Sequence, residues 1–122
     1  VDFDTAVRFV SGFGGGMGRL REVCGTFSGA VIVVNALYGY SDPKNVQAKT
    51  ELYSRIQELA AQFRRDNGSI ICKELLGLSR PEGSPIPEAR TDEYYKKRPC
   101  PELCRYSANM LEEYIREHPP VK

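Results

Sequence analysis

Apolar residues recur at intervals of three, four and seven along much of the chain, the spacing that gathers them on one face of an α-helix. The clearest such segment starts at Ser41-Asp42-Pro43, a typical helix start, and runs to Asn67-Gly68, a typical helix end. Its apolar positions are predicted to face the core, namely Val46, Tyr53, Ile56, Ala60 and Phe63.

Residues 3–13 and 25–38 are predicted to form two further helices. In the first, Asp4 is the expected N-cap and Gly12 the expected end. The second contains a β-branched run, Val31 to Val34, which favours a strand. Its length, its small residues and the stop at Gly39 favour a buried helix, which we predict.

Two helices are predicted near the cysteine-rich second half of the chain. Ser69 is expected to cap a short helix over "IICKELLGL". In "CPELCRYSANMLEEYIREH", Pro101 suits the first helical position, which makes Cys100 the N-cap. The apolar face of this last helix is predicted to comprise Leu103, Ser107, Met110, Leu111, Tyr114 and Ile115.

Together these segments predict an all-α, compact single domain over residues 1–122, with about five helices. The length suffices for one hydrophobic core. A glycine-rich loop follows the first helix, and a long Pro-rich surface loop runs from Ser79 to Pro99. In that loop Tyr94 and Tyr95 are expected to cover the core rather than contact a site.

The charge balance narrows the function classes. A net charge of +1 argues against a nucleic-acid or membrane-surface footprint. The sequence contains no run of about 18 apolar residues and so predicts no membrane-spanning helix. No signal peptide pattern is present. We therefore expect a cytoplasmic protein whose thiols are reduced.

The glycine-rich loop, "GFGGGMGRLREVCGTFSG", lacks the spacing of a dinucleotide fingerprint or a P-loop. Two interpretations stay open. The backbone of Gly14, Gly15, Gly16 and Gly18 could form an anion-binding nest, with Arg19 and Arg21 adding positive potential. Alternatively, the loop is a compact turn over a packed helix. The single histidine, His118, argues against His-based triads and His-rich zinc sites.

The four cysteines, Cys24, Cys72, Cys100 and Cys104, fall at or near predicted helix starts. A helix N-terminus favours thiolate, which is the reactive and metal-binding form. Cys100 and Cys104, four residues apart, share one helix face. They could ligate one metal, or one could resolve the other's oxidation product. The competing interpretation is that cysteines such as Cys72 and Cys104 are small buried hydrophobes.

Four segments together resemble the C_GCAxxG_C_C family: "SGFGGGMGR", "CGTFSG", "GSIICKELLG" and "CPEL". Cys24, Gly25 and Gly29 fit its Cys-Gly-Ala-x-x-Gly motif, with Thr26 in place of Ala. Cys72 and Cys100 fit two further family cysteines. The family's first cysteine has no counterpart in residues 1–13, so it was lost or lies upstream of Val1.

The resemblance implies a redox-active protein. Cys24, Cys72 and Cys100 would be its reactive thiols, with Cys24 central and shielded by the glycine loop. All four cysteines could instead hold an iron–sulfur cluster or another thiolate-bound metal. It implies a redox or transporter-associated partner, and a homodimer stays open. The alternatives are an anion- or protein-binding module using the glycine loop, and a zinc-stabilised structural domain.

Overall fold

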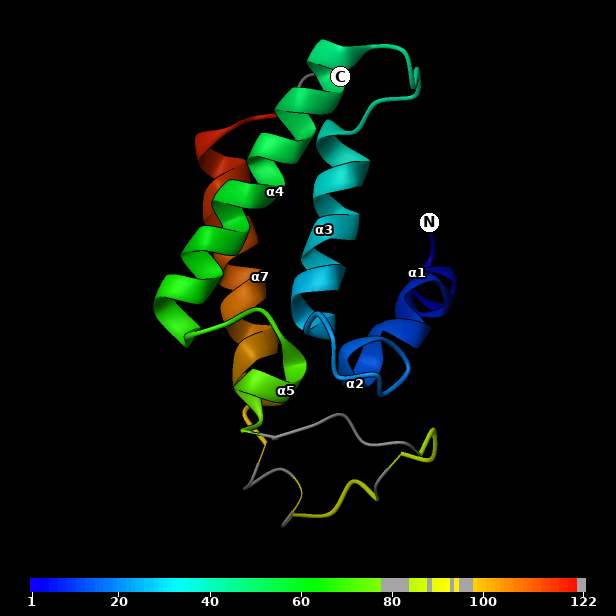
Figure 1. Ribbon diagram of the computed structural model, residues 1–122. Coiled ribbons are helices and arrows are strands. Elements are labelled where there is room, and N and C mark those ends of the chain that lie inside the picture. Colours follow the sequence, from blue (N-terminus) through cyan, green and yellow to red (C-terminus); the bar gives the residue numbers. More distant parts are fainter. Residues whose placement is uncertain (78–83, 88, 93, 95–97, 121–122) are drawn as a thin grey trace.

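The computed structural model describes residues 1–77, 84–87, 89–92, 94 and 98–120 of the chain (Figure 1). Every regular element in these ranges is helical, so the all-α prediction is confirmed. Three long helices lie side by side: α3 (Gly25–Tyr38), α4 (Val46–Asn67) and α7 (Cys100–Glu117). In Figure 1, α4 runs opposite to α3, and α7 runs in the same direction as α3.

The shorter elements gather around the first turn of α3 and the first turn of α7. The chain begins with α1 (Phe3–Val10), a 3₁₀ turn (Ser11–Phe13) and α2 (Gly14–Met17), which lie beside the start of α3. A single turn, α5 (Cys72–Leu75), lies near the start of α7 and contacts α2. None of the described helices has the length and apolar composition needed to cross a membrane.

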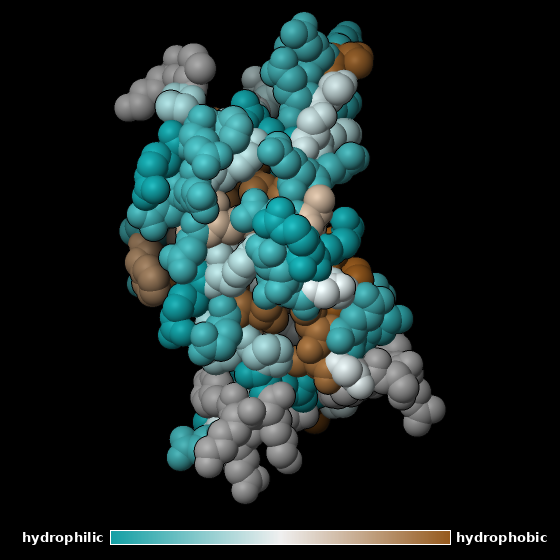
Figure 2. Space-filling model, turned by 90° about the vertical axis from the view of Figure 1, so that its left-hand side faces the viewer, coloured by the Kyte–Doolittle hydropathy of each residue, from teal (hydrophilic) through white to brown (hydrophobic). Residues whose placement is uncertain are grey.

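The hydrophobic core lies where α3 meets α4 and α7. Phe63 of α4 is fully buried, and its ring packs edge-on against Phe27 of α3 and Tyr106 of α7, with centroids 5.7 and 5.5 Å apart. Figure 2 shows the α4 and α7 side of the molecule, where hydrophilic side chains cover most of the surface. Other buried members of this core are Ala30, Val34, Leu52, Leu59, Ala60, Leu103, Met110 and Tyr114.

The predicted helix over residues 25–38 is confirmed, despite its β-branched run. Phe27, Ala30 and Val34 recur at helical spacing and are buried between the flanking helices. Burial of that face outweighs the weak preference of the β-branched residues for a strand. Ile32 and Val33, on the outer side of α3, remain over one third exposed.

The start of α4 was predicted too early. The Asn45 side chain accepts a hydrogen bond from Ala48 N at 3.0 Å and so caps the helix. Asp42 instead accepts from Lys44 N within a turn. The helix ends at Gly68, as predicted, in a left-handed conformation with φ 96°.

Two of the core positions predicted on α4 are also wrong. Val46 is 71% exposed and Tyr53 is 52% exposed, whereas Leu52 and Leu59 are buried. The apolar pattern on α4 is broad enough to fit two faces, and contact with α3 and α7 selects the one through Leu52 and Leu59.

Three other local predictions need correction. The first helix ends at Val10, not at Gly12. Asp2, not Asp4, caps α1, accepting from Thr5 N at 2.7 Å. Cys100 is the first residue of α7, and Pro99 precedes it as the N-cap. The predicted buried face of α7 is confirmed, with two of its members, Leu111 and Ile115, only half-buried.

The cap predicted at Ser69 and the length of the helix after it also differ from the structure. Ser69 Oγ accepts from Ile71 N at 2.9 Å and pairs with Glu74 Oε1, while Ile71 occupies the N-cap position. The helix itself is reduced to the single turn α5. The predicted Pro-rich loop of residues 79–99 lies only partly within the described residues, and Tyr95 lies outside them.

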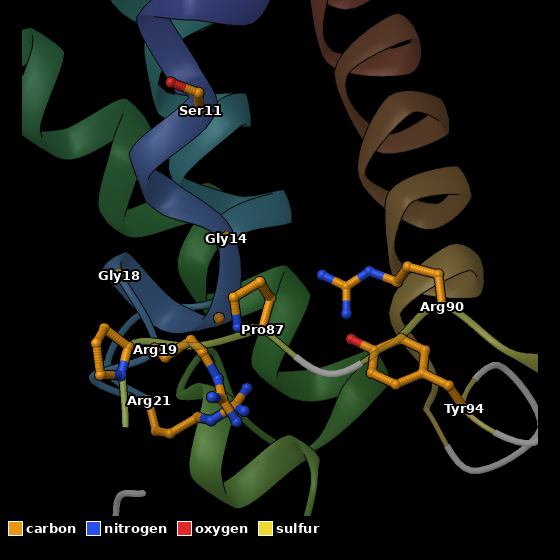
Figure 3. A pocket seen from close by; sticks show the side chains of 10 residues that line it. Ser11, Gly14, Gly18, Arg19, Arg21, Pro87, Arg90 and Tyr94 are labelled. Carbon is orange, nitrogen blue, oxygen red and sulfur yellow. The ribbon is translucent and has the colours of Figure 1, made fainter. Parts of the chain in front are cut away.

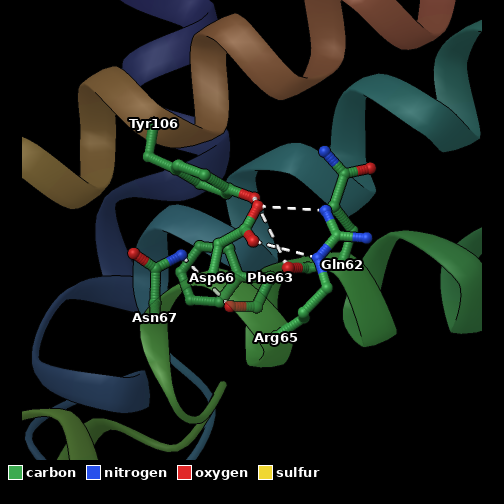
Figure 4. A network of polar contacts seen from close by, with 6 residues as sticks. All are labelled: Gln62, Phe63, Arg65, Asp66, Asn67 and Tyr106. Atoms are coloured by element: carbon green, nitrogen blue, oxygen red, sulfur yellow. Dashed lines mark hydrogen bonds and ion pairs between the residues drawn. The ribbon is translucent and has the colours of Figure 1, made fainter.

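A polar cluster joins the end of α4 to α7 (Figure 4). The Tyr106 hydroxyl lies within hydrogen-bonding distance of the Asp66 carboxylate and of Gln62 O. Arg65 pairs with the same carboxylate at 3.0 Å. The Arg65 and Tyr106 hydrogen bonds lower the pKa of Asp66, while burial, followed by the bond to Asp66, raises the pKa of Tyr106.

Candidate functional site

All four cysteines line one cavity of about 400 Å³. The cavity lies among the glycine-rich loop, the first turns of α3 and α7, and α5. Cys24 and Cys72 are buried, Cys100 is half-buried and Cys104 is exposed. No disulfide joins them. Four cysteines that are up to 80 positions apart in the sequence therefore line the same cavity.

Cys24 and Cys72 are held by a short antiparallel pairing of residues 21–24 with residues 70–73. Cys24 N donates to Ile70 O at 2.7 Å, and Cys72 N donates to Glu22 O at 2.5 Å. An isolated bridge links Val23 to Ile71 between them. These backbone bonds fix the starts of α3 and α5 relative to each other, so both thiols face the same cavity.

The glycine-rich loop forms another part of the cavity wall through a left-handed turn. Residues 15–19, which include Met17 and Arg19, all have positive φ, between 56° and 72°. Gly16 is buried, and a Cβ there would lie 2.6 Å from the Cβ of Cys72. The bare backbone of Gly16 thus lets the loop close directly over Cys72.

Cys100 and Cys104 reach the cavity from the first two turns of α7. Ser107, one turn further on, donates its hydroxyl to Thr26 O at 2.9 Å. This buried bond ties α7 to the start of α3, beside Cys24. The position of α7 against α3 therefore sets the distance between its two thiols and the buried pair.

Two polar groups contact the buried sulfurs. Arg21 is itself buried, and its Nη1 donates to Cys72 Sγ at 3.7 Å. Cys24 Sγ lies 3.2 Å from Thr26 Oγ1. A guanidinium donor would stabilise negative charge that develops on Cys72, because hydrogen bonds with a charged partner are about twice as strong as neutral ones.

Residues 1–114 match the model of a family described as "Putative redox-active protein (C_GCAxxG_C_C)". The chain belongs to this family. No curated protein and no solved structure matches the chain. The resemblance inferred from the cysteine and glycine segments is thus confirmed, and the four cavity cysteines lie within the matched residues.

The family motif has a direct packing reason at its first glycine. Gly25 is the first residue of α3, and a Cβ there would lie 2.7 Å from Phe13 O. A side chain would push the turn before the glycine-rich loop away from the cavity. Thr26 departs from the motif's alanine, and its side-chain hydroxyl is the group that contacts Cys24. The departure adds a hydrogen-bonding partner for Cys24.

The expected preference for thiolate is wrong for the two cysteines of α7. Burial raises the pKa of the Cys100 thiol, and the neighbouring thiolates of Cys24, Cys72 and Cys104 raise it further, while Arg98 lowers it. Burial raises the pKa of Cys104 as well, followed by the effect of Cys24. Desolvation, the largest cause for both thiols, disfavours their charged form. Charge on one cavity thiol therefore opposes charge on the next.

Replacing Cys24 with serine is expected to move the alkylation of Cys100 to lower pH. Thiolate is the reacting form, so the rate rises about tenfold per pH unit until the pH passes the pKa. The substitution removes one cause that raises the pKa of Cys100, while burial, the largest cause, remains. The measurement is the iodoacetamide rate at the Cys100 peptide, followed by mass spectrometry across the alkaline range.

Cys104→Ser is the matched control for this titration. Cys104 is the weakest of the causes that act on Cys100, so its removal should shift the midpoint less. An unchanged midpoint in Cys24→Ser would show that the two thiols do not interact electrostatically.

The four thiols form a donor set that soft metals prefer, yet they are not gathered as metal ligands. Among the described residues, no group of three or more His, Cys, Asp or Glu side chains is arranged to hold a metal ion. An iron–sulfur cluster would need its thiolates brought together on one face of the cluster. The arrangement of the described side chains thus does not fit such a group.

Sequence reasoning did not find the two lining residues that come from the Pro-rich loop, Arg90 and Tyr94. Tyr94 was expected to cover the core, but it is half-buried and lines the cysteine cavity. Both residues come from the Pro-rich loop, where no periodicity predicts which side chains turn inward. The pairing of Arg90 over the Tyr94 ring, 4.4 Å from its centroid, depends on the tertiary structure alone.

Proposed function

We propose that this member of the redox-active family is a thiol–disulfide exchange protein, with the four-cysteine cavity as its redox centre. The single observation that supports the proposal is that all four free cysteines line one cavity. Thiols that exchange a disulfide must be able to reach one another, and these four come together from three separate segments of the chain. The family description gives the redox activity only in general terms.

The reaction is a two-electron exchange with a disulfide substrate. One cavity thiolate attacks a sulfur of the substrate, forming a mixed disulfide and releasing the first substrate thiolate. A second cavity thiolate then attacks the cavity sulfur, forming an internal disulfide and releasing the second substrate thiolate. The two cavity thiols give up two protons and two electrons, and the substrate disulfide takes up the electrons as two thiols.

We assign the exchange to Cys24 and Cys100. Cys24 is buried directly before α3, and the bond from Ser107 to Thr26 O holds α7 beside it, which supports a central position. Cys100 is the first residue of α7 and lines the same cavity, which supports its role as the resolving partner. Its raised pKa keeps it protonated at neutral pH, so it attacks only after the mixed disulfide has removed the neighbouring charge. Cys72, beside Arg21, is the alternative partner.

The test is a redox titration of protein purified without oxygen. The protein is equilibrated with mixtures of reduced and oxidised glutathione, and its free thiols are counted. We expect the count to fall from four to two in one transition, with a disulfide between Cys24 and Cys100 mapped by mass spectrometry. Cys24→Ser should abolish this transition, and Cys104→Ser should retain it.

The same preparation separates the competing functions. Four thiols that stay free at every glutathione ratio would overturn the proposal. Iron with sulfide in stoichiometric amount would favour an iron–sulfur protein, and zinc alone would favour a zinc-stabilised domain, which should unfold with a chelator.

A further inference from the structure

A second cavity, of about 210 Å³, adjoins the cysteine cavity and is lined by three arginines (Figure 3). The arginines are Arg19, Arg21 and Arg90. The two cavities share five lining residues: Gly14, Gly15, Arg21, Arg90 and Tyr94. A ligand held in the arginine cavity would therefore extend directly into the space that the four cysteines line.

The arginine cavity brings three arginine side chains together in a protein whose net charge is only +1. Arg21 is only 5% exposed, which is rare for arginine. In Figure 3 the side chains of Arg19 and Arg21 lie together on one side of the cavity, and Arg90 and Tyr94 reach in from the other.

The loops around the cavity hold these side chains in place. Nη1 of Arg19 donates to Ser84 O at 3.1 Å and also to Ile86 O, which fixes the Pro-rich loop over the cavity. Arg90 stacks on the ring of Tyr94. A Cβ on Gly15 would lie 2.9 Å from Cγ of Arg19 and 3.6 Å from Nη1 of Arg21, so the bare glycine leaves room for both arginines.

From this geometry we infer that the substrate of the thiol centre is a small anionic disulfide, whose carboxylate binds in the arginine cavity while its sulfurs enter the cysteine cavity. The inference rests on the proposed thiol–disulfide exchange and names its substrate class. Guanidinium groups match carboxylates in geometry and charge. The two volumes together are those of a small-molecule site, which is too small for a folded partner.

In the exchange, the substrate R–S–S–R loses its S–S bond and leaves as two R–SH molecules, while two cavity thiols form one S–S bond. The arginines take no part in this electron balance. They position the carboxylate, and Arg21 links the two cavities because it lines both and donates to Cys72 Sγ.

Binding is tested first, without any redox step. The probe is 3,3′-thiodipropionate, a thioether dianion that cannot exchange, with bis(2-hydroxyethyl) sulfide as its neutral counterpart, both titrated by calorimetry into the reduced protein. We expect the dianion to bind and the neutral thioether not to bind. Arg90→Gln should weaken the binding of the dianion about tenfold or more. Arg90→Lys, which keeps the positive charge, should weaken binding less.

Arg116→Gln is the matched control, because it removes the same charge from the exposed surface of α7. Equal weakening by Arg90→Gln and Arg116→Gln would overturn the inference, since it would reflect net charge alone. Equal affinity for the dianion and the neutral thioether would overturn it as well.

The second measurement is the rate at which 3,3′-dithiodipropionate and the neutral bis(2-hydroxyethyl) disulfide oxidise the protein. We expect the dianion to react about tenfold faster or more at low salt, an advantage that Arg90→Gln removes. Equal rates would overturn the inferred substrate and leave the thiol–disulfide function standing. Oxidation by neither disulfide, with Arg90-dependent binding of the thioether dianion intact, would overturn the redox function and leave an anion site.

Discussion

Replacing Phe63 with alanine is expected to lower the free energy of unfolding by about 3–5 kcal/mol. Phe63 has no exposed surface and lies where all three long helices meet. Its loss removes the edge-on contacts with Phe27 and Tyr106 and leaves a cavity that helices held by other contacts can close only in part. Urea denaturation, followed by circular dichroism, measures the change.

Phe3→Ala is the matched control, because it removes the same side chain from a position that is 81% exposed. Its effect should stay within about 0.5 kcal/mol. Similar losses for the two variants would mean that the centre of the core is not where α3, α4 and α7 meet. The contrast tests the packing of the long helices independently of any function.

Replacing Gly16 with alanine should cost about 2–5 kcal/mol, the sum of left-handed strain and overpacking. The residue is buried with φ 68°, and its new Cβ would lie 2.6 Å from the Cβ of Cys72 and 2.7 Å from Glu22 N. Glu22 N and Arg21 Cα, the latter 2.8 Å away, belong to the backbone, so the contact cannot be relieved by a side-chain rotation. The loop must move away from Cys72.

Two glycines of the same loop separate the causes of this loss. Gly18→Ala meets no atom within 4 Å but keeps a φ of 56°, so it should cost only the conformational strain, about 1–2 kcal/mol. Gly14→Ala meets no atom and has a negative φ, so it should be near neutral. Thermal unfolding of the three variants should rank them Gly16, Gly18, Gly14. A small effect at Gly16 would contradict the close approach of the loop to Cys72.

Gly16→Ala should also change the chemistry of the cavity. Displacing the loop would open the wall over Cys72, so this thiol should react faster with a bulky maleimide than it does in the native protein. Gly14→Ala provides the comparison in which the wall is intact.

The helices were largely predictable because their signals are local. The end of α4 at Gly68 and the whole of α3 follow from periodicity and from glycines at helix ends. The predicted start of α4 was wrong because Ser41-Asp42-Pro43 and Asn45 are both acceptable helix starts. A side-chain bond from Asn45 to Ala48 N selects the later one.

The candidate site was predictable in its cysteines and only partly in its surroundings. The glycine and cysteine segments identified the family, and the structure brings all four predicted cysteines to one cavity. Their reactivity remains a prediction. Arg90 and Tyr94 could not be found, because a loop rich in proline and charge carries no period that assigns its side chains to an inner or outer face.

The sequence by itself determined the helical class, the ends of α3 and α4, the family and the kind of chemistry that four thiols can do. These properties depend on neighbours within a few positions and on residue type. Tertiary structure alone decided that residues 21–24 pair with residues 70–73, that Gly16 covers Cys72, and that arginines adjoin the cysteines. It also reversed the expected direction of the pKa of Cys100. Desolvation and close approach arise between segments far apart in the chain, so no local pattern records them.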